Sequence, residues 1–132
     1  MAAKRAVIDS LSGLELALAP TFREDFRESL YRMMGALTGL GVTVMATVEH
    51  ADSYTDLRFS PYGIAFLTDA IIIQRYIELD GELRRAMGVV KVRSSAHDKQ
   101  LHEYDIAADG GIAVGSALKG YEGLLAGAPR TK

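Results

Sequence analysis

The chain has 132 residues, of which 48% are hydrophobic and 24% are charged, and its formal net charge is −2. This length suits one domain with a single core, and the slightly negative charge argues against a general nucleic-acid or membrane-surface binder. Cysteine is absent, which excludes disulfides, cysteine metal sites and thiol nucleophiles. The N-terminus has no apolar core of a signal peptide and no apolar run reaches membrane-spanning length, so we expect a cytoplasmic protein.

The first third of the chain has the pattern strand, helix, strand. Ala6-Val7-Ile8 is a short apolar run, and a buried strand this near the start indicates the back part of a larger domain. Thr21 and Glu24 form a capping box for a helix that runs to Leu40 and ends at Gly41. Residues at spacings of three and four predict its buried stripe: Phe22, Phe26, Leu30, Met33, Leu37 and Leu40. Residues 41–48 are apolar and β-branched, which predicts a second strand and an α/β unit.

The second half of the chain has the pattern of antiparallel strands. After a polar loop over residues 49–61 and a short helical turn within 61–69, two long strands are expected over 70–79 and 83–93, joined by a hairpin turn at Asp80-Gly81. Shorter strands are expected over 100–106 and 112–114, and residues 117–132 are weakly patterned. The predicted fold is a mixed sheet with the 21–40 helix on one face and a β-rich C-terminal part.

The stretch Val90-Lys91-Val92-Arg93-Ser94-Ser95-Ala96-His97-Asp98-Lys99 has the chemistry of an anion clamp. Side chains two apart on a strand share a face, so Lys91 and Arg93 are predicted to point the same way, together with Arg85 and Val89. A guanidinium fork beside an ammonium suits a polyphosphate, and Ser95 and His97 add donors from the following turn. The alternative is a solvated strand whose cations pair with Glu78 or Glu82.

Asp9 ends the apolar strand Val7-Ile8, and in nucleotide-hydrolysing folds such an acid holds Mg²⁺ beside the phosphates. The alternative is that Asp9 or Ser10 caps the turn after the strand. His50, His97 and His102 lack the spacing of a metal site. No Gly-Lys dipeptide occurs, so the sequence contains no P-loop motif.

An ordered series of segments extends these single motifs over nearly the whole chain. The series is Lys4-Arg5-Ala6-Val7-Ile8-Asp9-Ser10, Phe66-Leu67-Thr68-Asp69-Ala70-Ile71-Ile72, Gln74-Arg75-Tyr76-Ile77-Glu78, Gly81-Glu82-Leu83-Arg84-Arg85, Val90-Lys91-Val92-Arg93, His97-Asp98-Lys99 and Glu103-Tyr104. Taken together, it resembles the KaiC family of RecA-like P-loop ATPases.

The resemblance implies that residues 1–132 form one partial RecA-like domain that starts at the Walker B strand. It implies a hexameric ring with ATP between neighbouring subunits, and Mg²⁺ held on the side of Asp9. Lys91 and Arg93 would face the γ-phosphate of the neighbour's ATP. Others would line that site or stand beside it: Val92, Ser95, His97, Lys99 and Arg85. ATP and Mg²⁺ are then cofactors of the intact parent protein, with none expected on this chain alone.

Three departures from the family pattern limit what the resemblance implies. The P-loop and the paired catalytic glutamates of the family lie upstream of the Walker B strand, so the chain by itself is not expected to catalyse ATP hydrolysis. Ser94 stands where the family has glycine, which predicts a different turn after the Lys-x-Arg strand. Ala65 and Phe66 stand where the clock members have a Ser-Thr pair, so clock-type autophosphorylation at that pair is not expected.

Two functions remain open from the sequence. The first is the C-terminal part of a KaiC-like ATPase domain, working in a homo-oligomer that is a hexameric ring in the parent family or a dimer for this piece. The second is a non-catalytic binding or scaffolding module that oligomerises or docks on a partner protein.

Overall fold

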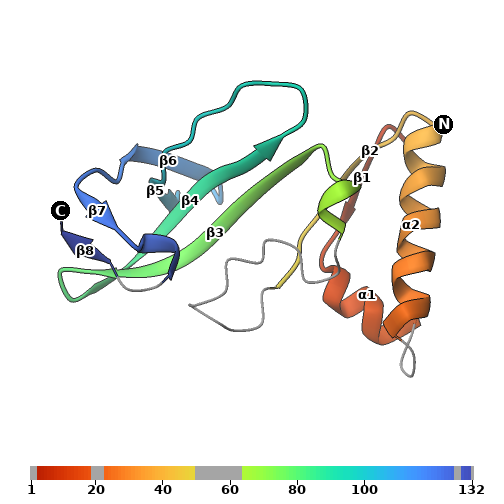
Figure 1. Ribbon diagram of the computed structural model, residues 1–132, viewed down its shortest axis with the longest axis horizontal. Helices are drawn as coiled ribbons and strands as arrows, with labels where there is room; N and C mark the ends of the chain where they lie inside the picture. Colours follow the sequence, from red (N-terminus) through yellow and green to blue (C-terminus); the bar gives the residue numbers. More distant parts are fainter. Residues whose placement is uncertain (1–2, 19–22, 50–63, 127–128, 132) are drawn as a thin grey trace. The chain divides into compact units, whose positions relative to one another are not determined.

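The structure is a computed structural model, and it describes residues 3–18, 23–49, 64–126 and 129–131. The chain divides into two compact units (Figure 1). The first is made of residues 1–51 and 61–67, and the second of residues 52–60 and 68–132. Each unit is described by itself below.

The first unit is an α/β unit, as the sequence predicts. Its elements in chain order are β1 (Arg5–Ile8), α1 (Leu11–Leu18), α2 (Arg23–Gly39), β2 (Thr43–Ala46) and the 3-10 turn η1 (Ile64–Phe66). Strands β1 and β2 pair in parallel, with Arg5 opposite Thr43 and Ile8 opposite Ala46. Because parallel strands require a crossover connection, the two intervening helices supply it.

The long helix α2 packs on the core of the first unit through the predicted stripe. Phe26 and Leu30 are buried with Leu11, and Met33 packs against this cluster. The helix ends in a Schellman motif: the N–H of Val42 donates to the carbonyl of Leu37 and the N–H of Gly41 donates to that of Thr38. Gly41 has φ 74°, so it is the predicted stop.

The structure corrects one detail of the predicted helix, adds a helix that was not predicted, and leaves the predicted capping box outside the described residues. Leu40 is 80% exposed because it follows the last helical residue and leaves the buried stripe. The sequence analysis also missed α1, whose eight residues are too short for a clear helical period. Thr21 and Phe22 lie outside the described residues, and with them the predicted capping box.

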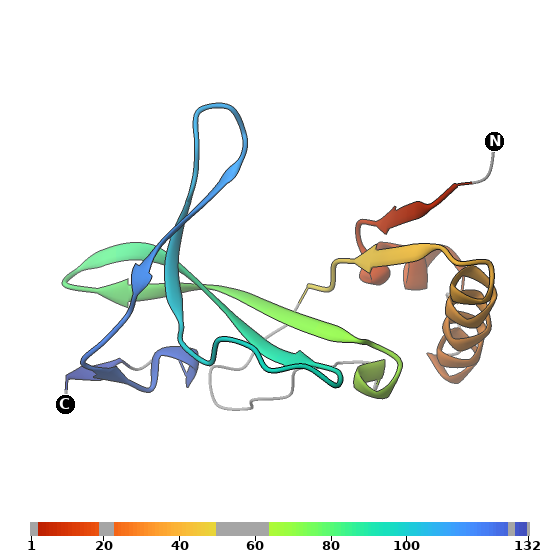
Figure 2. The ribbon, with the colours of Figure 1, turned by 90° about the horizontal axis from the view of Figure 1, so that it is seen from above.

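The second unit is a β structure. Its strands are β3 (Ala70–Leu79), β4 (Glu82–Val92), β5 (His102–Ile106), β6 (Ile112–Ala117), β7 (Tyr121–Glu122) and β8 (Arg130–Thr131), with the 3-10 turn η2 (Leu124–Ala126) before β8. The first four form an antiparallel sheet in the order β3-β4-β5-β6. The β3–β4 turn has positive φ at both Asp80 and Gly81, as a type I′ hairpin requires. The β5–β6 hairpin rises steeply away from β3 and β4 (Figure 2).

The predicted single mixed sheet is not what the described residues form. The parallel pair β1-β2 and the antiparallel strands belong to separate sheets, and β7-β8 form a third. The antiparallel strands pair with their neighbours in sequence through short turns, which closes small loops at little entropic cost.

The core of the second unit lies on one face of β3–β4, here called the inner face. Ile77, Leu79 and Ala86 are buried there with Leu124 of η2. Leu101, Leu118 and Tyr121 pack against this cluster. The weakly patterned tail therefore supplies part of the core, which the sequence analysis did not anticipate.

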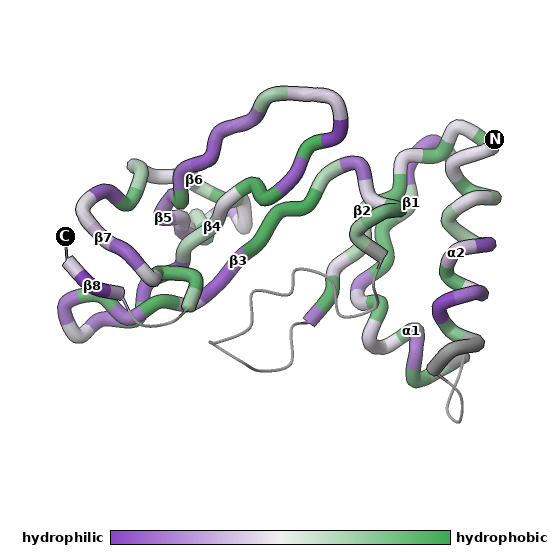
Figure 3. Tube along the Cα trace, in the orientation of Figure 1, coloured by the Kyte–Doolittle hydropathy of each residue, from purple (hydrophilic) through white to green (hydrophobic). Residues whose placement is uncertain are grey.

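Apolar residues are concentrated on β1, β2 and the first half of β3 (Figure 3). Among the described residues, no helix is both long and apolar enough to span a membrane.

Candidate functional site

A β-bulge decides which way the cations of β4 point. Residues Leu79 to Ile72 of β3 pair in register with Glu82 to Val89 of β4, but Ile71 pairs with Lys91, so Val90 is an extra residue. Cross-strand partners share a face, and Ile71 and Ile72 lie on opposite faces. Lys91 therefore lies on the inner face, opposite to Val89.

Lys91 and Arg93 share this inner face, as predicted. The Arg93 N–H donates to the carbonyl of Asp69 at 2.7 Å, which continues the ladder beyond β4, and the Arg93 guanidinium lies 3.4 Å from the Asp69 carboxylate. The Lys91 Nζ donates to the carbonyl of Thr68 at 2.9 Å. Both cations are thus held at the start of β3, and the Arg93 side chain stays 51% exposed.

Arg85 and Val89 do not share this face, so that prediction is wrong. The bulge at Val90 reverses the alternation, and both residues lie on the outer face of the hairpin. The Arg85 guanidinium is 3.1 Å from the Asp105 carboxylate and lies over the ring of Tyr76 at 5.6 Å from its centroid. Val92 lies between Lys91 and Arg93 in the sequence. It pairs with Ala70, so its side chain points to the outer face.

The loop after β4 carries the other predicted ligands. Ser94 has φ 58°, the left-handed conformation that glycine adopts most easily. Ser95 and Lys99 are exposed. His97 is half-buried, and its buried Nδ1 atom has no hydrogen-bond partner among the residues that the structure describes. A buried polar atom with no partner is uncommon in folded proteins, so His97 stands out within the described part of the chain.

These residues fit a polyphosphate by their chemistry. A guanidinium and an ammonium share one face at the end of β4, and a hydroxyl, an imidazole and a second ammonium follow within six residues of Arg93. Donors of this kind suit phosphate oxygens because every one of them can donate to an anion.

In the first unit, Asp9 and Thr47 follow the carboxyl ends of the two parallel strands. The Thr47 hydroxyl donates to the Asp9 Oδ1 atom at 2.5 Å, and the Leu11 N–H donates to the Thr47 carbonyl at 2.9 Å. The carboxyl ends of parallel strands are where α/β folds bind ligands. Thr47 was missed by sequence reasoning, although a hydroxyl residue directly after an apolar strand is a usable signal.

Ser10, which the sequence offered as an alternative cap, does cap the turn. Its hydroxyl accepts from the Gly13 N–H at 3.4 Å, and its carbonyl accepts from the Leu14 N–H at 3.1 Å. This leaves the exposed Asp9 carboxylate with the Thr47 hydroxyl as its partner across the parallel pair.

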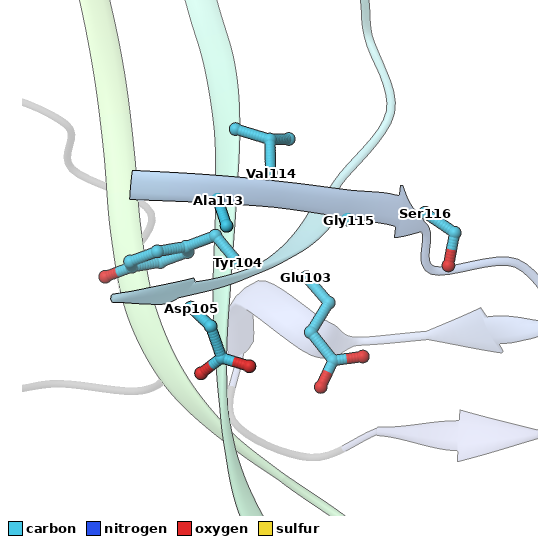
Figure 4. Close-up of a pocket in the computed structure, with 7 residues that line it drawn as sticks. All are labelled: Glu103, Tyr104, Asp105, Ala113, Val114, Gly115 and Ser116. Carbon is cyan, nitrogen blue, oxygen red and sulfur yellow. The ribbon is translucent and has the colours of Figure 1, made fainter. Parts of the chain in front are cut away.

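A pocket lies on the β5–β6 hairpin, and its charged lining residues are carboxylates, which do not suit phosphate. The Glu103 and Asp105 carboxylates point to one side of the hairpin and Val114 to the other (Figure 4). The remaining lining residues are uncharged: Tyr104, Ala113, Gly115 and Ser116. In the described ranges, no cluster of three or more His, Asp or Glu side chains is placed to hold a metal ion.

Ala65 and Phe66, two positions without a side-chain hydroxyl, lie in η1. The Phe66 ring is 6.4 Å from that of Tyr31, so this position serves an aromatic contact within the first unit.

Comparisons with known proteins show the family of this chain. A family model described as the KaiC ATPase matches residues 1–119. The chain belongs to the KaiC ATPase family. It is 33% identical over 130 residues to the circadian clock protein KaiC3 of Synechocystis sp., covering 95% of this chain and 24% of that protein. It is 32% identical over 127 residues to the circadian clock oscillator protein KaiC of Picosynechococcus sp., covering 95% of this chain and 23% of that one. The chain therefore spans about a quarter of the length of the curated relatives it matches.

Proposed function

We propose that this chain is the C-terminal part of a KaiC-like, RecA-like ATPase domain and that it contributes a Lys-x-Arg strand to ATP bound by a neighbouring subunit. Family membership supports the ATPase class. The observation that carries the proposal is that two cations meet the start of β3: the Lys91 Nζ donates to the Thr68 carbonyl, and the Arg93 guanidinium lies 3.4 Å from the Asp69 carboxylate.

In this proposal Lys91 and Arg93 stabilise negative charge on the transferred phosphoryl group. Fixed cations aimed at the developing charge are a main source of catalysis in phosphoryl transfer. The loop residues Ser95, His97 and Lys99 add donors around the same phosphates, with the main chain of Val92 between the two cations. Arg85 lies outside this site, since its guanidinium is engaged by Asp105 on the outer face.

Asp9 is proposed as the Walker B acid of this subunit's own site. It stands at the carboxyl end of β1, and the Thr47 hydroxyl orients its carboxylate. Mg²⁺ prefers oxygen ligands and keeps several waters, so one exposed carboxylate suits water-mediated binding. When bound, Mg²⁺ would neutralise phosphate charge beside Asp9.

The nucleotide cradle itself must come from another part of the parent protein. The 132 residues contain no Gly-x-x-x-x-Gly-Lys motif, and the relatives are about four times as long as the matched segment. The proposal also includes an oligomeric arrangement, in which the subunits form a ring, and a cytoplasmic location.

The test supplies a polypeptide that carries the P-loop half of the domain and measures ATP hydrolysis by the complemented complex. Replacing Lys91→Ala or Arg93→Ala should each lower the turnover rate by about 10²-fold, since removing one charge-stabilising donor typically has that effect. Arg32→Ala is the matched control, because Arg32 is exposed on α2 and pairs with Glu28.

Parental rates in both variants would refute the assignment of the Lys-x-Arg strand. A complemented complex that neither binds nor hydrolyses ATP would refute the ATPase proposal as a whole and favour the non-catalytic scaffolding module.

A further inference from the structure

His102 on β5 is held between two hydrogen-bond acceptors. Its Nδ1 atom is 3.0 Å from the carbonyl oxygen of Gly115 on β6, and its Nε2 atom is 2.9 Å from the Oδ2 atom of Asp98 in the loop after β4. Neither partner can donate when Asp98 is ionised. Both ring nitrogens must therefore carry a proton for both hydrogen bonds to form, so this geometry selects the imidazolium.

The Gly115 carbonyl is available because β6 is irregular at this point. His102 pairs with Ala117 and Tyr104 pairs with Val114, so β6 has one more residue than β5 between the two pairs. A Cβ atom at Gly115 would lie 3.2 Å from the Glu103 carbonyl oxygen, so glycine lets the two backbones approach closely. The bulge thereby aims the Gly115 carbonyl at the imidazole.

Asp98 joins this pair to the loop that carries the proposed phosphate donors. Its Oδ1 atom accepts from the Gln100 N–H at 2.8 Å, which forms a local turn, while its Oδ2 atom accepts from His102. Ser95, His97 and Lys99 lie on the same loop. The chain of contacts thus runs from β6 through His102 and Asp98 to the loop.

We propose that protonated His102 is a positioning residue that clamps the 94–100 loop to β6, so that the loop's hold on phosphate weakens when the imidazole loses a proton. This inference deepens the nucleotide site proposed above and rests on it. His102 itself touches no reacting atom in this scheme and acts through Asp98.

The charges around His102 agree with that assignment. The Gly115 carbonyl, and then the Asp98 carboxylate, raise the pKa of His102 above its ordinary 6.5. The Gln100 N–H, and then His102, lower the pKa of Asp98 below its ordinary 3.8. Met87 of β4 and Ala117 of β6, which pair with His102, carry no charge, and the carboxylate of neighbouring Glu103 lies 3.8 Å from Arg84.

The pH window follows from these two directions. Protonated His102 contributes fully to the stability of the folded chain below pH 6.5, and this contribution is lost as pH rises through its raised folded-state pKa. Ionised Asp98 contributes fully to the stability of the folded chain above pH 3.8, and this contribution is lost as pH falls through its lowered folded-state pKa. The clamp is therefore complete between these limits and opens on the alkaline side when His102 deprotonates.

The first experiment measures imidazole ¹⁵N shifts and amide-exchange protection of residues 94–100 against pH by NMR in the 132-residue chain. We expect His102 to titrate above 6.5 and loop protection to fall as it titrates. In Asp98→Asn, the amide oxygen can still accept from Gln100, but the amide NH₂ faces the ring and favours the neutral imidazole. The His102 titration should then shift to lower pH. Asp109→Asn is the control, because Asp109 accepts from the Gly111 N–H at 2.9 Å in the same type of local turn.

A His102 titration at or below 6.5, or one that Asp98→Asn leaves unmoved, would overturn the inference. Loop protection that stays constant while His102 titrates would overturn it too. A second arm measures ATP affinity of the complemented complex at pH 6 and at a pH above the His102 titration. We expect weaker binding at the higher pH in the parent and a smaller difference in Asp98→Asn. If the NMR results hold and ATP binds at neither pH, the nucleotide site proposed above fails while the clamp stands.

Discussion

Asp80, before β4, and Ser94, after it, both adopt the left-handed conformation. Asp80 suits this conformation better than Ser94 does. Asp80 has φ 54° in a turn where Asp-Gly is favoured, and Ser94 has φ 58° directly after the Lys-x-Arg strand. A left-handed conformation costs an ordinary residue about 1–2 kcal/mol because its Cβ approaches the following carbonyl oxygen. Ser94 therefore retains strain that glycine would relieve, at the position that connects Arg93 to the donor loop.

Replacing Ser94→Gly should raise the free energy of unfolding by up to about 1 kcal/mol, because the relief of the left-handed strain exceeds the added freedom of glycine in the unfolded chain. Urea denaturation followed by circular dichroism measures the change. Ser95→Gly is the control, since Ser95 is exposed and is not one of the residues with positive φ; it should be neutral or slightly destabilising. Equal losses of stability in both variants would contradict the argument.

At the scale of elements, the short turn η2 closes the core of the second unit. Leu124 is 5% exposed and packs with Ile77, Leu79 and Ala86. The Arg75 guanidinium on the inner face of β3 also donates to the Leu125 carbonyl, which ties η2 to the sheet. The matched family region ends at residue 119, yet the antiparallel sheet depends on this later segment for its buried face.

Replacing Leu124→Ala should lower the free energy of unfolding by about 2–4 kcal/mol, since it removes buried methyl groups and leaves a cavity. Leu83→Ala is the matched control, because Leu83 lies on the outer face of β4 and is 75% exposed. Chemical denaturation of both variants gives the comparison. The role of η2 would be refuted by equal effects of the two substitutions.

At the scale of the whole molecule, the first unit exposes apolar sheet surface. Val7 and Met45 are cross-strand partners in the parallel pair and are 70% and 63% exposed. Parallel sheets normally have both faces covered. The uncovered face therefore supports the proposal that these strands work inside a larger ATPase domain, together with a segment that carries the P-loop.

We expect the 132-residue chain alone to show no ATP hydrolysis above the buffer rate, since phosphoryl transfer depends on the positioning that a P-loop and Mg²⁺ provide. Release of phosphate from ATP after rigorous purification measures this. An Asp9→Ala variant separates intrinsic from contaminating activity. Turnover that the parent shows and Asp9→Ala loses would mean that the chain assembles a working site by itself.

The sequence by itself determined the features that depend on neighbouring residues. The stripe through Phe26 and Leu30 located α2, Gly41 its end, and Asp80-Gly81 the β3–β4 turn. Helical period and turn chemistry are local properties, so they can be read without knowing the fold. The ordered motifs also identified the KaiC family, which the comparisons confirmed.

Only the tertiary structure decided which residues meet. The bulge at Val90 turned Lys91 to the inner face and left Arg85 on the outer one, although simple alternation predicts one shared face. The Thr47–Asp9 contact joins residues 38 positions apart, and the contact of His102 with Gly115 depends on the irregular pairing of β6. Strand irregularities are set by packing across the sheet, and that packing involves residues distant in sequence. Strand alternation was enough to predict that Lys91 and Arg93 share a face, but the separation of Arg85 from them and the part played by Thr47 could not be predicted from the sequence.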